Sequence, residues 1–462
     1  MFLLYSILLT VGFLALLPRF LFQRKYAAGF RERLGRLPDF DAEGKPVVWL
    51  HCVSVGETQA ARPLVEEIKE NFPEYKLVVS TTTLTGQTVA REIFANDAAL
   101  VFYFPFDWKF SVRRALRRIK PKVILLMETE IWFNFVREAG KSGAKIALVN
   151  GRLSEKSAQR YAIIRRTFQR VFHFVNVALM QESKDARRLI DLGVRYPKVK
   201  ITGNIKFDQP FEASDLTEEF RKRFSISKDA PLIVAASTHA PEESLIADAF
   251  KQVYKTAKIA RLPRLLIVPR HPERFAEVAE TIKATGFEWA RRSDAPSSHD
   301  AAAEIILLDS IGELRAILPL AEIVFVGGSL IPHGGQNVLE AAAARTAIVT
   351  GFYTMNFEAI VQELVSEGAL IQLPKLDEKE AFSELVEIFT NLLQTEEKRE
   401  RLAANAFRVM NANRGATAKT IEYLAPLFNQ NNLPASESST TAARSQKVKL
   451  KTSAGRRGTG KK

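Results

Sequence analysis

The chain has one cysteine in 462 residues, so it can form neither a disulfide framework nor a zinc ribbon. That residue, Cys52, lies in the apolar run VVWLHCV and is interpreted as a small core side chain. Metal signatures are also missing. There is no H-E-x-x-H, and the only Asp-x-Asp, Asp39 to Asp41, precedes the first expected strand. We therefore expect no resident metal ion and no metal ligands.

Two common nucleotide-binding signatures are absent as well. The chain has neither the G-x-x-x-x-G-K-[ST] of a P-loop nor the G-x-G-x-x-G of a dinucleotide-binding turn. Aromatic and basic residues do not interleave as they do in proteins that bind single-stranded nucleic acid. We therefore expect no nucleic-acid partner, and any nucleotide site must depend on other residues.

The net charge of +14 is concentrated at the two ends of the chain. Residues 433–462 hold eight Lys or Arg and one Glu, and residues 1–40 hold six Lys or Arg and two acids. The body between them is only mildly basic. Basic residues beside an apolar N-terminus favour a membrane surface as the partner rather than a nucleic-acid groove.

The N-terminus carries an apolar run without charged side chains from Met1 to Pro18, followed by Arg19. The run is just long enough to span a bilayer or to insert deeply into it. A signal peptide would place positive charge before such a run, whereas here the charge follows it. We expect residues 1–25 to be a retained membrane anchor, with the body on the cytoplasmic face. Pro18 leaves open whether the anchor spans the membrane or lies in its interface.

Apolar runs alternate with helical patterns after residue 45. The runs lack polar alternation, as buried parallel strands do, and the series restarts after a polar linker. This pattern predicts an α/β fold with two Rossmann-like domains facing a cleft. The expected strands are 47–53, 75–81, 99–104, 122–127, 144–150 and 175–181, then 232–237, 264–269, 304–309, 322–327 and 346–351.

The same pattern sets the expected boundaries. We predict an N-terminal domain over 37–208, a linker over 209–229 and a C-terminal domain over 230–428. Residues 431–462 are rich in Ser, Thr, Ala, Gly and Lys without periodicity, which predicts a disordered basic tail. Ligands in such sheets bind beyond the carboxyl ends of the strands, so polar residues there are the candidates for function.

Charged residues follow the strands of the first domain. Glu57 begins a helix, either as a carboxylate favoured by the helix dipole or as a base facing the cleft. Glu128 and Glu130 flank one residue in METEIWFN, so an extended backbone would point them the same way; solvated acids at a helix cap are the alternative. Lys206, in TGNIKFD, is either an ordinary surface lysine or a cation that reaches the cleft.

Anion-binding features follow the strands of the second domain. Arg270 and His271 lie in VPRHPERF, and arginine suits forked contacts to phosphate. Gly312 lies at an expected helix start, where free N–H groups suit an anion. The stretch VGGSLIPHGGQNVLEAA, residues 326–342, has four glycines that would let a ligand approach closely. Together these residues predict a nucleotide site. A membrane-bound transferase, a nucleotide-sugar epimerase and a non-catalytic nucleotide sensor all remain open at this point.

Eight motifs in order then resemble one family. SVGE, METEIWFN, NGRLS, TGNIKFD, ASTH-x-x-EE, VPRHPERF, GEL and GGSLIPHGGQNVLEAA are similar to the 3-deoxy-D-manno-octulosonic acid (Kdo) transferases of lipopolysaccharide synthesis, over residues 1–425. The resemblance implies a GT-B fold, an inner-membrane anchor and a cytoplasmic active site. It implies CMP-Kdo as the donor substrate, a lipid A precursor as the acceptor, inversion at the transferred sugar, and no metal or other cofactor.

The resemblance also assigns residues. Glu57 would be the general base, and Glu128 and Lys206 would stabilise the transition state. CMP would be bound by a set of residues that follow three strands: Arg270, His271, Ile311, Gly312, Glu313, Asn337, Val338, Leu339 and Glu340.

The sequence departs from the family pattern in a few places. The family usually has proline at Val338 and Phe133, and glycine at Pro241. GFYTMNF, residues 351–357, lacks the family's histidine and is given no role. Two alternatives accompany this reading: a GT-B transferase for another activated sugar onto a membrane lipid, and a nucleotide-binding protein without catalysis.

Overall fold

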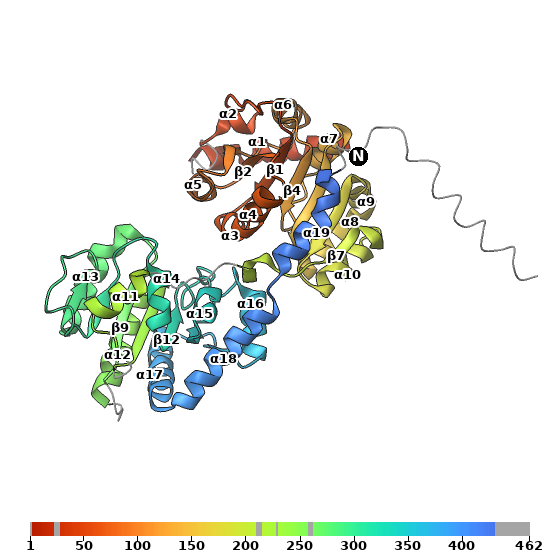
Figure 1. The fold of residues 1–462 in the computed structure, drawn as a ribbon. Helices are drawn as coiled ribbons and strands as arrows, with labels where there is room; N and C mark the ends of the chain where they lie inside the picture. The colour runs from red at the N-terminus through yellow and green to blue at the C-terminus, as the bar shows by residue number, and fades with distance from the viewer. Residues whose placement is uncertain (1, 23–27, 209–214, 228–229, 257–261, 430–462) are drawn as a thin grey trace, which may run out of the picture.

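The computed structural model describes residues 2–22, 28–208, 215–227, 230–256 and 262–429 (Figure 1). The predicted tail, the end of the predicted anchor and parts of the predicted linker lie outside these residues. Within them the chain forms two α/β domains, each built on a seven-stranded parallel sheet. The expected architecture of two parallel-sheet α/β domains is confirmed.

The N-terminal sheet has the strand order β3-β2-β1-β4-β5-β6-β7. Strands β1, β2, β4 and β5 are apolar runs that are buried on both faces because helices cover each side, whereas the edge strand β3 is partly exposed. The strands are β1 Val47–Cys52, β2 Lys76–Thr81, β3 Ala98–Tyr103, β4 Val123–Met127, β5 Lys145–Gly151, β6 Val175–Met180 and β7 Val199–Ile201.

Ten α-helices and two short 3-10 helices belong to this half of the chain. They are α1 Phe2–Phe22, α2 Phe30–Arg33, α3 Val55–Ala60, α4 Arg62–Asn71, α5 Leu84–Ile93, α6 Lys109–Ile119, α7 Phe133–Lys141, α8 Glu155–Ile163, α9 Arg165–Phe172, α10 Ser183–Asp191, η1 Tyr196–Lys198 and η2 Ile205–Asp208.

The C-terminal sheet repeats the plan with the order β10-β11-β9-β8-β12-β13-β14. Its core clusters lie on the two faces of the sheet. The strands are β8 Leu232–Thr238, β9 Arg264–Pro269, β10 Trp289–Arg291, β11 Ile305–Leu307, β12 Ile323–Val326, β13 Ala347–Thr350 and β14 Leu370–Gln372. The helices are α11 Asp215–Arg223, α12 Glu242–Thr256, η3 Pro272–Arg274, α13 Phe275–Thr285, α14 Leu314–Ile317, η4 Leu318–Leu320, α15 Leu339–Ala343, α16 Glu358–Ser366, α17 Glu378–Gln394, α18 Glu396–Ala412 and α19 Ala416–Asn429.

All eleven expected strands are present, and three further strands are not predicted by the apolar pattern. These three, β7, β10 and β14, are three residues long and lie at sheet edges. An edge strand pairs on one side only and stays partly exposed, so it needs no continuous apolar run. Their sequences VKI, WAR and LIQ therefore carry no signal that distinguishes them from loops.

The strand orders place a switch point in each sheet. The connections run in opposite directions from β1 and β4 in the first sheet, and from β8 and β12 in the second. A crevice forms beyond the carboxyl ends of strands at such a point, and ligands bind there. The fold therefore directs attention to the loops that follow these four strands.

The last helix returns to the first domain. In Figure 1 the blue helix α19 lies on the N-terminal half, although α17 and α18 belong to the other half. Its Phe428 stacks on Phe72 with ring centroids 4.1 Å apart, and Tyr75 donates a hydrogen bond to the Phe428 carbonyl. The predicted boundary at residue 428 assigned this helix to the C-terminal domain, whereas its buried side chains complete the core of the N-terminal one.

Asp208 joins the two chain segments that pass between the domains. Its carboxylate accepts hydrogen bonds from the backbone N–H of Gly415, at 2.7 Å, and of Thr417, which are free donors at the start of α19. We expect Asp208→Ala to lower the free energy of unfolding by about 1–2 kcal/mol, as the loss of a helix cap does. Urea denaturation would measure this, and hydrogen exchange should show α19 opening first.

The control for Asp208 is Asp191→Ala, which removes an exposed carboxylate from the same domain. Equal stability of the two variants, with unchanged exchange in α19, would contradict a capping role for Asp208.

Helix α1 packs on the N-terminal domain through polar side chains. Tyr5 donates a hydrogen bond to the buried Asp107 carboxylate at 2.8 Å, and Thr10 accepts one from the Trp108 indole at 3.0 Å. The opposite face of the helix exposes Leu4, Ile7, Leu8, Val11 and Leu14. A search of the described residues finds no helix with the length and apolar character needed to cross a membrane.

Candidate active site

Glu57 lies in the first turn of α3, just after β1, at the switch point of the first sheet. Ser54 caps α3 and also donates its hydroxyl to Glu57 Oε1 at 3.0 Å. The second carboxylate oxygen accepts the Val53 N–H at 2.8 Å. Two donors thus fix the carboxylate of a side chain that is only 6% exposed, so Glu57 is a preorganised acid rather than a solvated one.

The environment of Glu57 disfavours its charge. Burial raises its pKa to about 8, and the nearby negative charge of Glu128 adds to the effect, although the Val53 and Ser54 hydrogen bonds oppose it. A carboxyl with a pKa in this range can hold or release a proton near neutral pH. The structure therefore gives Glu57 the protonation behaviour of an acid–base group, which its sequence position alone does not reveal.

Glu128 and Lys206 form an ion pair near Glu57. Lys206 Nζ lies 3.3 Å from Glu128 Oε1, and both side chains are largely shielded from solvent. Lys206 comes from η2, so residues 78 positions apart meet at the carboxyl edge of the sheet. The lysine also lies 5.7 Å from the ring centroid of Phe357, which belongs to the C-terminal domain. Lys206 therefore occupies the junction of the two domains.

The backbone around Glu128 differs from the extended segment that we expected. Glu128 adopts a left-handed conformation with φ 52°, so alternation along a strand does not orient it. Glu130 is nevertheless close enough for its pKa to be raised, first by burial and then by the charge of Glu128. The strained turn points the first acid toward Lys206, an arrangement typical of functional sites.

A cleft of about 510 Å³ lies between the two domains. Its N-terminal wall comes from α3, α4 and the end of α5, and its C-terminal wall comes from the ends of β8, β9 and β12 and from α14 and α15. Gln59, two residues after Glu57, is part of the N-terminal wall. Arg270, Ile311, Gly312, Asn337 and Glu340 all line the cleft, so the structure brings these five predicted residues together.

Arginine side chains give the cleft a cationic character. Arg62, Arg270 and Arg315 line it from three different elements. Arg315 donates to Glu340 Oε1 from Nη2 at 2.9 Å and from Nε at 3.1 Å, so this pair is a fixed part of the wall. Guanidinium groups at the carboxyl edge of a Rossmann-like sheet suit the phosphate of a nucleotide.

The glycine-rich turn after β12 differs from the open cradle that we expected. The N–H groups of Gly328, Ser329 and Leu330 all donate to the buried carboxylate of Glu242, at 2.6 to 2.9 Å. Glycine is required at Gly327, because a Cβ there would lie 2.7 Å from the Thr238 Cα. This half of the turn therefore binds the protein's own carboxylate, and only the later residues of the stretch reach the cleft.

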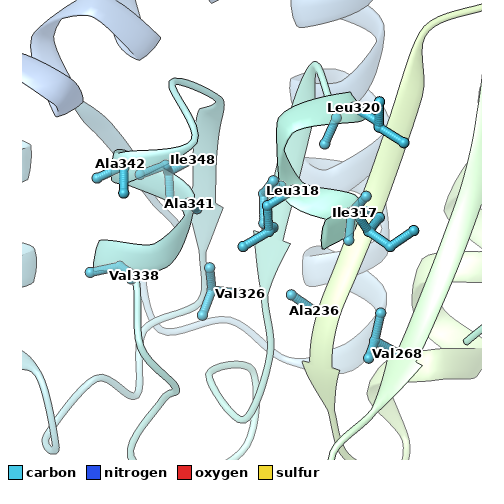
Figure 2. Packing of buried hydrophobic residues seen from close by; sticks show 14 of the residues in the cluster. Ala236, Val268, Ile317, Leu318, Leu320, Val326, Val338, Ala341, Ala342 and Ile348 are labelled. Carbon is cyan, nitrogen blue, oxygen red and sulfur yellow. The ribbon is translucent and has the colours of Figure 1, made fainter. Parts of the chain in front are cut away.

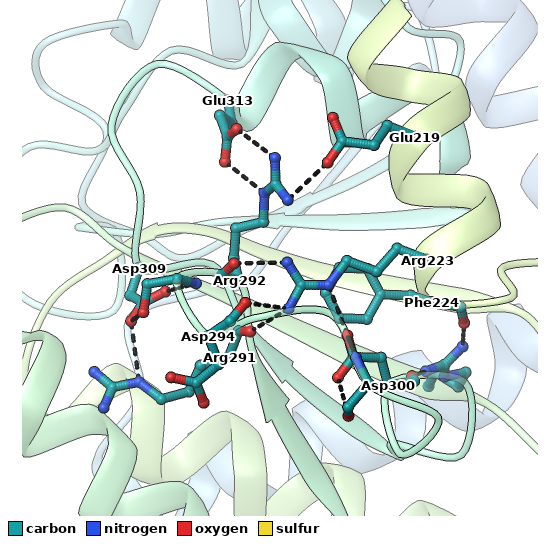
Figure 3. A network of polar contacts seen from close by, with 12 residues as sticks. Glu219, Arg223, Phe224, Arg291, Arg292, Asp294, Asp300, Asp309 and Glu313 are labelled. Carbon is teal, nitrogen blue, oxygen red and sulfur yellow. Dashed lines mark hydrogen bonds and ion pairs between the residues drawn. The ribbon is translucent and has the colours of Figure 1, made fainter.

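Four of the predicted nucleotide residues do not line the cleft: His271, Glu313, Val338 and Leu339. Val338 and Leu339 are buried in the core, and Figure 2 shows Val338 among the apolar side chains behind the turn. Glu313 accepts two hydrogen bonds from Arg292, at 2.9 and 3.0 Å, in the polar network of Figure 3. Desolvation by burial raises the pKa of Glu313, but the hydrogen bonds from Arg292 and from the Ser310 hydroxyl outweigh this effect, so the net pKa is lowered.

His271 lies next to Arg270 in the chain but is not among the residues that line the cleft. It precedes η3, its side chain is about half exposed, and its imidazole contacts His239 rather than the cleft lining.

Sequence reasoning missed four residues of the site. Gln59, Arg62 and Arg315 line the cleft, and Glu242 holds the glycine-rich turn. Arg62 and Arg315 could have been found, since Arg315 directly follows the GEL motif and Arg62 lies five residues after SVGE. Glu242 belongs to the ASTH-x-x-EE motif, but the motif does not indicate which groups this acid binds.

Comparisons with known proteins identify relatives of the whole chain. Residues 28–209 match the sequence profile of the 3-deoxy-D-manno-octulosonic-acid transferase (kdotransferase) family. The chain is 33% identical over 411 residues to the 3-deoxy-D-manno-octulosonic acid transferase of Haemophilus influenzae, covering 88% of this chain and 93% of that protein. The transferase of the same name from Bordetella pertussis is 30% identical over 381 residues, covering 82% and 86% of the two chains.

Solved structures share the fold at low sequence identity. UDP-GlcNAc 2-epimerase from Neisseria meningitidis superposes with a TM-score of 0.55 at 13% identity, covering 82% of this chain and all of that one. A glycosyltransferase from Rickettsia africae gives a TM-score of 0.53 at 12% identity, covering 84% and 99%. These likenesses show the two-domain arrangement of GT-B glycosyltransferases and do not by themselves assign an activity. Because the sequence relatives span nearly its whole length, the chain belongs to the 3-deoxy-D-manno-octulosonic acid (Kdo) transferase family of glycosyltransferases.

Proposed function

We propose that this protein transfers Kdo from CMP-Kdo to a lipid A precursor with inversion, using Glu57 as the general base. The observation that supports this best is the position of Glu57. Two hydrogen bonds fix its carboxylate beside the ion pair of Glu128 and Lys206, and its own helix forms one wall of the interdomain cleft. A base on the helix that forms one wall, with Arg270 and Arg315 on the other wall, suits a transfer between a bound nucleotide sugar and an acceptor hydroxyl.

The chemical step follows from these positions. The Glu57 carboxylate takes the proton of an acceptor hydroxyl while that oxygen bonds to the anomeric carbon of Kdo. The bond from this carbon to the phosphate oxygen breaks, and its electron pair leaves with CMP. Attack opposite the leaving group inverts the anomeric centre in a single displacement.

The neighbouring charges stabilise this step. As CMP departs, the sugar becomes oxocarbenium-like, and the nearby Glu128 carboxylate stabilises its positive charge. Lys206 and Arg270 stabilise the negative charge that develops on the phosphate. Arg315, Asn337 and Glu340, which line the cleft, would hold the nucleotide. No metal or other cofactor takes part in this proposal, because the cations that balance the leaving group come from side chains.

The same proposal places the protein at the inner membrane with its catalytic body in the cytoplasm. A lipid acceptor requires the active site to approach a bilayer, and the exposed apolar face of α1 suits contact with one. Tyr5 and Thr10 attach the other face to the domain, so we propose that this helix lies in the interface.

The pH dependence of transfer follows from Glu57. A base acts in its ionised form, so we expect kcat/KM to rise about tenfold per pH unit below the pKa of about 8 and to level off above it. Glu128→Gln removes a like charge and should shift the inflection to lower pH. Initial rates at roughly pH 6 to 9 would measure both profiles. A profile without an inflection in this range would contradict Glu57 as the base.

The decisive test is transfer from CMP-Kdo, generated in situ, to a tetraacylated lipid A precursor without added metal. Mass spectrometry of the product would show the added sugar and count the units transferred. If no product forms although CMP binds, the donor or acceptor assignment fails, and a panel of other activated sugars would identify the replacement.

A further inference from the structure

Three of the six histidines gather at one edge of the C-terminal sheet. His239 and His333 follow β8 and β12, the strands at the switch point, and His271 follows the neighbouring strand β9, so each comes from a different loop. The His239 and His333 rings stack with centroids 4.7 Å apart, and the His239 and His271 rings meet edge to face at 5.1 Å.

His239 is the buried member of this histidine cluster. It is 7% exposed, and its Nδ1 has no hydrogen-bond partner among the residues that the structure describes. Burial and the proximity of His333 and His271 lower its pKa to about 4, so the ring is neutral at neutral pH. A buried polar atom without a partner costs about 1–3 kcal/mol, which a ligand can recover.

The histidine cluster lies beside the nucleotide cleft and not inside it. Ser237, Arg270 and Gln336 line the cleft and are near neighbours of the three histidines in the chain. Gln336 Nε2 and His239 Nδ1 lie 3.3 and 3.4 Å from the point that a Cβ on Gly328 would occupy, so the two side chains converge on one spot. A ligand that fills the cleft and extends past Gln336 meets His239 next.

The donor of the proposed reaction, CMP-Kdo, is long enough to fill the cleft with its nucleotide and to extend toward the histidines with its sugar. CMP ends at its phosphate, beyond which the sugar carries several hydroxyls and a carboxylate. Neutral imidazole both donates an N–H and accepts an O–H, so it suits hydroxyls and carboxylates alike. A metal ion is a poorer occupant, because no group of His, Cys, Asp or Glu in the described chain is arranged to hold one.

We propose that His239, His271 and His333 form the subsite for the sugar of the donor, separate from the site that holds its nucleotide. This inference rests on the proposed function and deepens it, since it assigns the residues that distinguish a Kdo donor from free CMP. It also gives His271 a role toward the sugar in place of the nucleotide contact that the resemblance implied.

The test compares the donor with its nucleotide alone. In steady-state assays of His333→Ala, His239→Gln and the double variant, we expect the KM for CMP-Kdo to rise about tenfold or more, and the inhibition constant of CMP to change less than twofold. His299→Gln is the control, because it removes an exposed imidazole from the same domain outside the cluster.

Each outcome of these assays either supports or overturns the proposed sugar subsite. An unchanged donor KM in the double variant overturns the subsite, as does an equal loss of affinity for donor and CMP, which would indicate a nucleotide or structural role. His333 is exposed, so its variant reports on binding even if a change at buried His239 disturbs folding. Transfer by the wild-type protein in the same assay separates failure of this inference from failure of the proposed function.

Discussion

Glu57→Gln should abolish transfer while leaving donor binding intact. The amide keeps the size of the side chain but cannot take a proton, and general-base catalysis contributes about 10²- to 10⁴-fold to such reactions. We therefore expect kcat to fall by about that factor with the KM for CMP-Kdo changed less than threefold. Steady-state kinetics would measure the split, and CMP titration would confirm that the cleft is intact.

The same variant should be more stable than the wild-type protein at alkaline pH. The folded pKa of Glu57, about 8, lies above its ordinary value of 4.5, so the folded state binds the extra proton and the wild type loses stability as pH rises through this window. The glutamine does not titrate. The free energy of unfolding of the variant should equal that of the wild type below about pH 4.5 and exceed it by about 1–3 kcal/mol above about pH 8.

Glu70→Gln is the matched control for both measurements. Glu70 is an exposed acid on the neighbouring helix α4, so its substitution should change neither transfer nor the pH dependence of stability. Substantial transfer by Glu57→Gln, at rates near those of this control, would remove Glu57 from the mechanism.

Lys206→Ala should reduce kcat by about 10²- to 10³-fold, the effect of removing one preorganised charge from a developing anion. The variant also removes the ammonium group that lies 3.3 Å from Glu128. Without this positive charge, the pKa values of the neighbouring acids Glu57 and Glu130 should rise. We expect the pH profile to move to higher pH as well as to lower rates. Rapid-quench measurements of a single turnover would separate the chemical step from product release.

The double variant Lys206→Ala/Glu128→Gln tests whether the ion pair acts as a unit. Residues in one network show non-additive effects, so the double variant should lose about as much activity as the worse single variant. Lys156→Ala, at an exposed position of the same domain, is the control. Losses that multiply would mean that the two side chains act independently.

The architecture could be predicted because it depends on apolar runs. Buried parallel strands leave long runs such as VVWLHC of β1, and the order of those runs is enough to indicate two domains and the loops that carry function. Glu57 and Arg270 could be predicted for the same reason, since each directly follows a strand. The edge strand β7 has the three-residue sequence VKI, which is not a long apolar run, so it could not be predicted.

Other features depend on contacts that no local pattern records. Glu128 points toward Lys206 because its backbone adopts a left-handed conformation. Glu242 accepts hydrogen bonds from the backbone N–H groups of a glycine-rich loop 86 residues away. The three histidines lie in separate motifs, ASTH-x-x-EE, VPRHPERF and GGSLIPHGGQNVLEAA, and nothing in these motifs indicates that their rings meet. Each of these arrangements is decided by tertiary packing, so only the three-dimensional structure reveals it.

The return of α19 to the first domain has a consequence for synthesis of the protein on the ribosome. Phe72 and Tyr75 emerge early, but Phe428, against which they pack, is translated more than 350 residues later. The nascent N-terminal half therefore waits with an open apolar groove while the second half folds. A premature stop codon anywhere in the second half leaves that groove uncovered, which marks the truncated product for chaperones and proteases.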